Sequence, residues 1–80
     1  MEERRQYPRH KVLKGGMVFC DGVGSIDCVV RNLSDFGACI EFSGATRPAD
    51  RFDIIIKPET HRRTCQAIWR KDNRVGIRFI

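Results

Sequence analysis

Short apolar or β-branched segments, separated by turn-forming residues, recur along the whole chain. The first, at 17–20, precedes a segment of turn formers that includes Asp21, Gly22 and Gly24. No stretch of helical length repeats its apolar residues every 3.6 positions. The pattern therefore predicts about six strands in a closed or nearly closed antiparallel barrel. The expected strands cover residues 17–20, 28–33, 38–42, 52–57, 63–69 and 75–79.

The last of these segments has the clearest alternation, because Val75, Ile77 and Phe79 would share one face of a strand. The polar residues 71–74 before it are typical of a hairpin connection.

Length and composition limit the function classes. The chain has 80 residues, of which 41% are hydrophobic and 31% charged, as expected for one folded domain. A domain of this size has little room for a large catalytic cavity, so we do not expect an enzyme. We find no apolar run as long as a signal peptide or a membrane span, which predicts a cytoplasmic protein with no membrane insertion.

The positive charge is concentrated near the start. Residues 1–14 hold five Lys and Arg against two Glu, an excess of three within a total of +5. Such a segment attracts phosphates on a nucleotide, a nucleic acid or a lipid surface, although a solvated end would look the same. The four cysteines form no CxxC pair, so we expect reduced core residues and no metal site.

Two motifs carry candidate chemistry. In the first, Arg5 and Arg9 flank Pro8, which disfavours a helix and predicts an extended arm before the first strand. A guanidinium fork matches two phosphate oxygens, or the O6 and N7 atoms of guanine. An ordinary basic tail would also contain such a pair.

The second motif is Asn32-Leu33-Ser34-Asp35-Phe36-Gly37, at the end of an expected strand and in the following turn. Alternation predicts that Asn32 and Ser34 face outward together, where they could reach a guanine edge or a phosphate. Gly37 would supply a positive φ or allow a ligand close to the backbone. An ordinary serine turn ending in glycine is the alternative.

Taken together, the motifs resemble those of the PilZ domain family. The family signature is RxxxR followed by (D/N)xSxxG, and here 22 residues separate Arg9 from Asn32. The closing segment 67–79 is also similar to the end of that family's barrel. The resemblance implies one PilZ domain over residues 1–80, with an all-β fold of six antiparallel strands in a split-barrel-like β-barrel.

The resemblance further implies a sensor that binds cyclic di-GMP on its outer surface and needs no other cofactor. Arg5 and Arg9, on a basic arm at 1–11, would hold phosphates and guanine, while Asn32 and Ser34 would read the base edges. Gly37 would shape the turn.

Two further residues are candidate contacts. Arg4 is a basic residue just before the first motif, a feature that in the family accompanies two intercalated ligand molecules, so we expect a ligand dimer. Trp69 could stack on guanine or, alternatively, close the barrel. Ligand binding would order the arm, and an unidentified partner protein would recognise the new surface.

Two other functions fit the sequence less well. A small basic barrel could bind single-stranded nucleic acid, but stacking residues are scarce, with one Trp, one Tyr and five Phe. A barrel of this family could instead act as a protein-binding adaptor without nucleotide, although such relatives usually lack the motif residues. We therefore expect no nucleic-acid partner.

Overall fold

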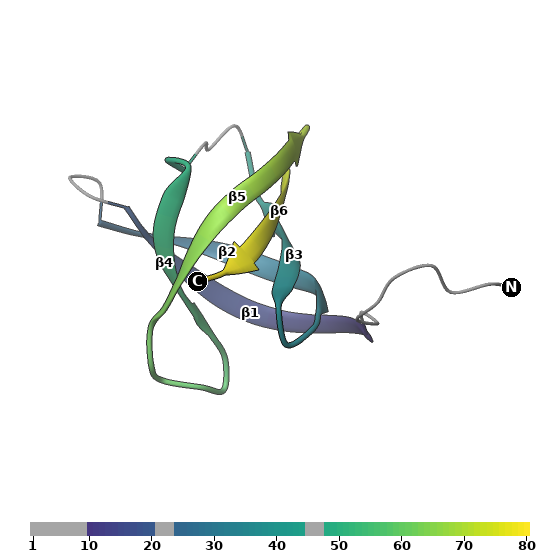
Figure 1. The fold of residues 1–80 in the computed structure, drawn as a ribbon, viewed down its shortest axis with the longest axis vertical. Coiled ribbons are helices and arrows are strands. Elements are labelled where there is room, and N and C mark those ends of the chain that lie inside the picture. Colours follow the sequence, from purple (N-terminus) through teal and green to yellow (C-terminus); the bar gives the residue numbers. More distant parts are fainter. Residues whose placement is uncertain (1–9, 21–23, 45–47) are drawn as a thin grey trace, which may run out of the picture.

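The computed structural model describes residues 10–20, 24–44 and 48–80 as an all-β barrel (Figure 1). The predicted barrel of six antiparallel strands is confirmed. No helix long and apolar enough to cross a membrane occurs among these residues. The strands are β1 (His10–Cys20), β2 (Gly24–Leu33), β3 (Gly37–Phe42), β4 (Arg51–Ile56), β5 (Arg63–Lys71) and β6 (Arg74–Phe79).

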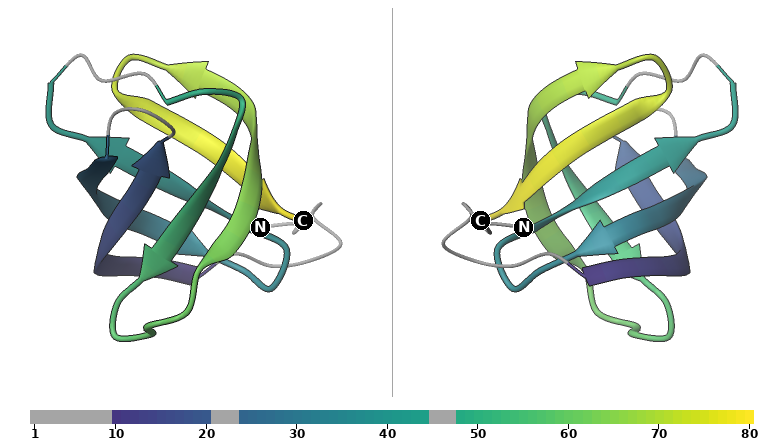
Figure 2. Two further views of the ribbon diagram at one scale, coloured as in Figure 1. Left: turned by 90° about the vertical axis from the view of Figure 1, so that its left-hand side faces the viewer. Right: turned by 90° about the vertical axis from the view of Figure 1, so that its right-hand side faces the viewer.

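The strands close in the order β1-β2-β3-β6-β5-β4, and every neighbouring pair is antiparallel. Closure depends on β1, which pairs with β2 along its length and with β4 over residues 16–19. Figure 2 shows how the strands curve around a common interior. As a result, β3 and β6 lie side by side although they are distant in sequence, and they join the second motif to the closing hairpin.

The first strand is longer than predicted. It begins at His10, so His10 and Lys11, which we expected in the arm, lie in β1. The predicted strand began at residue 17, whereas Gly16 already pairs with a residue of β2 and a residue of β4. A side chain at Gly16 would meet the Sγ of Cys28 at 3.0 Å, so glycine fits where β1 crosses the core. Pairing on both sides therefore outweighs the low strand propensity of glycine.

The core consists of alternate residues from the strands, as the pleat requires. Cys28 and Cys65 belong to it, and burial raises the pKa of each thiol to about 12. All four cysteines are described and none forms a disulfide. The largest fully buried side chains are Val18, Val30, Ile40, Phe42, Ile54, Ile56, Cys65 and Ile77.

We expect Ile54→Ala to lower the free energy of unfolding by about 2–5 kcal/mol, because it removes buried methyl groups and leaves a cavity. Ile54 is 0% exposed, whereas Ile80 is 63% exposed. Ile80→Ala is therefore the matched control and should stay within about 0.5 kcal/mol of the unmodified protein. Urea denaturation followed by circular dichroism measures both. Equal losses in the two variants would contradict the described core.

Candidate functional site

A β-bulge in β2 decides which way Asn32 faces. Val30 pairs with Ile40, but the next pair is Asn32 with Cys39, so Arg31 is an extra residue. Without the bulge, strict alternation from the buried Val30 would direct Asn32 into the core. The bulge moves Asn32 to the outer face. The predicted outward position thus has a different cause from the simple alternation that we invoked.

A second bulge has the same effect in β5. Ala67 pairs with Ile77 and Trp69 with Gly76, which makes Ile68 the extra residue. Because Cys65 and Ala67 pack in the core, unbroken alternation would bury Trp69. Instead the indole lies on the outer face and Trp69 is 40% exposed. Trp69 is therefore not part of the buried core, and its contact with a ligand stays a prediction.

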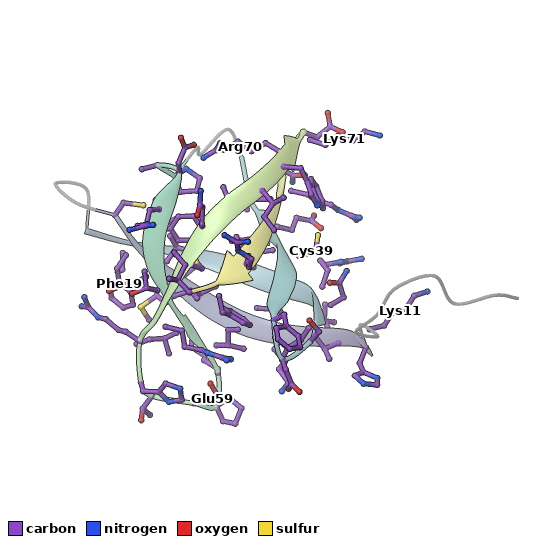
Figure 3. The ribbon with its side chains drawn as sticks, viewed as in Figure 1. Lys11, Phe19, Cys39, Glu59, Arg70 and Lys71 are labelled. Carbon is purple, nitrogen blue, oxygen red and sulfur yellow. The ribbon has the colours of Figure 1, made fainter. Side chains whose placement is uncertain are left out.

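The two bulged strands contribute to one line of residues across four adjacent strands. The pairs are Asn32 with Cys39, Cys39 with Gly76, and Gly76 with Trp69. Directly paired residues lie on the same face of a sheet, so these four residues form one surface, here called the outer row. Figure 3 shows Cys39 on the opposite side of the barrel from Phe19 of β1.

Gly76 allows the indole to lie against the sheet. A Cβ atom at this position would overlap the Nε1 and Cε2 atoms of Trp69. The ring therefore rests directly on the backbone of β6. Sequence reasoning did not single out Gly76 or Cys39, although a glycine inside a strand often marks such a close approach.

One side-chain atom of Asn32, in the outer row, lacks a hydrogen-bond partner among the described residues. Its Oδ1 atom is buried, and no donor among the described residues reaches it. A buried acceptor without a partner costs free energy, whereas a donor supplied from outside recovers it. Within the described residues Asn32 Oδ1 is therefore an acceptor without a donor.

Ser34 is occupied within its own turn. Its Oγ accepts hydrogen bonds from the backbone N–H groups of Phe36 and Gly37, each at 3.2 Å. The Ser34 N–H also donates to the Gly37 carbonyl at 2.9 Å. This is the serine turn that we considered as an alternative, and it holds the segment that follows Asn32.

Gly37 is needed for packing between strands. A Cβ atom here would overlap the backbone oxygen of Ile77, so glycine lets β3 approach β6 closely. The residue is not among those with positive φ. The expected positive φ is wrong, and the close approach is made by β6.

The strand that follows the arginine motif begins beside the second motif. Arg4, Arg5 and Arg9 lie outside the described residues. The strand that follows them can be placed, because His10 pairs with Leu33 and Lys11 pairs with Asn32. The described residues contain no group of three or more His, Cys, Asp or Glu suited to a metal ion.

Comparisons with known proteins agree with this architecture. The family model described as PilZ domain matches residues 3–80. One similar solved structure is the "PilZ domain with c-di-GMP of YcgR from Escherichia coli". It has a TM-score of 0.76 and 18% sequence identity, and the match covers 98% of this chain and 79% of that chain. A search of curated proteins found no match.

Gly76→Ala tests whether Trp69 lies against β6. The added methyl group should push the indole away from the sheet, so acrylamide should quench its fluorescence more strongly. Overpacking should also cost about 1–3 kcal/mol of stability. Trp69 is the only tryptophan in the chain, so the signal has one source.

Gly15→Ala is the control for this substitution, because a Cβ there meets only Lys57 Cδ, at 3.4 Å. Its quenching should equal that of the unmodified protein. Unchanged acrylamide quenching in Gly76→Ala would contradict the described packing of the Trp69 ring against β6.

Proposed function

Because the chain belongs to the PilZ domain family, we propose that it is a receptor for cyclic di-GMP. One observation carries the proposal: β1 begins directly after the RxxxR motif, and its Lys11 pairs with Asn32 of the second motif. The junction of the arm is therefore beside the polar end of β2. A short arm has only a small distance to cover to bring its guanidinium groups over the outer row.

In this proposal Arg5 and Arg9 supply the charge and the geometry for the ligand. Each guanidinium carries a rigid set of donors that fits phosphate oxygens or the O6 and N7 atoms of guanine. Cyclic di-GMP offers two phosphates and two guanines, so the pair can hold both kinds of group. Arg4 adds a third guanidinium for a second, intercalated ligand molecule.

The outer row supplies the surface on which the bases lie. Asn32 Oδ1, which has no donor among the described residues, would accept a hydrogen bond from a guanine N–H. The exposed face of Trp69 would stack on a base, a contact typically worth about 1–3 kcal/mol. Ser34 and Gly37 would keep the turn beside Asn32 in shape, and the long 3.4 Å bond from Ser34 Oγ to Gly37 could be exchanged for a ligand contact.

Binding would then act as a signal. Ligand phosphates would neutralise the arm and order it against the barrel, which creates a surface for an unidentified partner protein. The protein would be a non-catalytic cyclic di-GMP sensor located in the cytoplasm.

Calorimetric titration with cyclic di-GMP tests the arm. We expect two ligand molecules per chain, and we expect Arg5→Ala and Arg9→Ala each to weaken binding about 10- to 100-fold, as for loss of a charged hydrogen bond. Arg51→Ala removes an equal charge from the exposed surface of β4 and should bind as the unmodified protein does. A stoichiometry of one would refute the intercalated dimer, and full affinity in both arm variants would refute the clamp.

Asn32→Leu should separate binding from stability. Removing the unmet acceptor should leave the free energy of unfolding equal or slightly higher, because no hydrogen bond within the described residues is lost. Affinity for cyclic di-GMP should fall about tenfold or more.

Asn73→Leu is the matched control, because Asn73 Nδ2 donates to the Phe42 carbonyl at 2.7 Å. That variant should lose stability, measured by urea denaturation. If Asn32→Leu instead destabilised the protein and kept its affinity, Asn32 would be a structural residue.

A further inference from the structure

Two arginines beside the outer row share one carboxylate. Glu41 Oε1 lies 3.2 Å from Arg74 Nε and 3.6 Å from Arg31 Nε. Arg31 is the bulged residue of β2, Glu41 lies on β3 and Arg74 begins β6. We call these three residues the Glu41 cluster. It combines two positive charges with one negative charge on adjacent strands.

Both arginines keep most of their donors available. Their contacts with Glu41 go through Nε, and no hydrogen bond or ion pair to the terminal nitrogens of either is found among the described residues. The side chains of Arg31 and Arg74 are 43% and 50% exposed, against 29% for Glu41. The guanidinium ends therefore remain open to a ligand, above a carboxylate that lies deeper.

The Glu41 cluster is continuous with the outer row. Glu41 follows Cys39 by two positions on β3, and Arg74 precedes Gly76 by two on β6, so their side chains share the outer face. Next to them is a hollow of about 420 Å³. Its lining residues are Glu41, Trp69, Lys71, Asp72, Asn73 and Arg74.

We propose that Arg31 and Arg74 form a second phosphate-binding subsite, in which Glu41 is a resident anion that a ligand phosphate displaces. The proposal rests on the proposed function, since the phosphate is one of a cyclic dinucleotide stacked on Trp69. Arginine forks bind phosphate through paired hydrogen bonds. An exposed ion pair such as those of Glu41 contributes little stability, so its exchange for a phosphate is easy.

Glu41 then acts as a specificity residue. It neutralises part of the positive charge when no ligand is present, so a single weakly bound anion gains little from the subsite. A dinucleotide held at the same time by the arm and by Trp69 has a high local phosphate concentration and can replace the carboxylate. Arg31 and Arg74 thereby provide the attraction for the phosphate, and Glu41 lowers the affinity by competing with it.

Calorimetry with cyclic di-GMP tests the subsite through two substitutions. Glu41→Gln removes the competing charge and should strengthen binding about two- to fivefold, the range expected for an exposed ion pair. Arg74→Gln should weaken it by at least that factor, and the dependence of affinity on NaCl should decrease.

Asp53→Asn is the matched control for Glu41→Gln. Asp53 also faces an arginine, with its Oδ2 at 4.0 Å from Arg62 Nη1, and the change in net charge is the same. It pairs with Phe19 on β1, on the side of the barrel away from Cys39 (Figure 3). If Glu41→Gln and Asp53→Asn bind alike while the unmodified protein binds cyclic di-GMP, the subsite is refuted and the proposed function stands.

A nuclear magnetic resonance titration tests the subsite even if cyclic di-GMP does not bind, an outcome that would refute the proposed function alone. The probe is inorganic pyrophosphate, added at high concentration because a free anion competes only weakly with Glu41, and the signals are the Nε–H resonances of Arg31 and Arg74 in the unmodified chain. These protons face Glu41, so its displacement should shift both resonances. If pyrophosphate shifts the Nε–H resonances of Arg31 and Arg74 no more than it shifts the Nε–H resonance of Arg62, the subsite is refuted.

Discussion

A closed barrel allows each strand only one inward face, and the candidate site depends on two of the places where that rule is interrupted, one in β2 and one in β5. At Arg31 and at Ile68 a strand contains one extra residue, so the side chains that follow change faces. Both interruptions border the same pair of strands, β3 and β6, which keep regular alternation between them. The bulges thereby bring Asn32 and Trp69 out of the core and into one row.

Two glycines, which have no side chain, are as important to this surface as the residues with side chains. Gly76 leaves space for the indole, and Gly37 lets the backbones of β3 and β6 approach each other. Neither glycine has a positive φ, so glycine is required at these positions because of contacts across the sheet. As a result only Cys39 and Gly76, neither with a large side chain, lie between Asn32 and Trp69 in the outer row.

Charge is arranged around this region in two ways. The Glu41 cluster holds its arginines on strands, where the backbone limits their movement, and pairs them with a carboxylate. The motif arginines Arg5 and Arg9 precede β1 in the sequence, and the start of β1 pairs with Leu33 and Asn32. In the proposed mechanism the ligand phosphates bind both to the arginines of the Glu41 cluster and to the motif arginines. Binding on the sheet is thereby linked to the position of the arm.

The sequence by itself determined the class of fold, because apolar and β-branched segments between turn formers leave few alternatives to a small barrel. It also identified Asn32 and Trp69 as candidate residues, since the motif spacing and the single tryptophan are visible without coordinates. Only the tertiary structure decided the direction of these side chains. A bulge is a mismatch between two paired strands, so a pattern read along one strand cannot reveal it. For the same reason the sequence could not assign Gly76 its role, or bring Glu41 to Arg31 and Arg74, because those contacts exist only after β3 and β6 have paired.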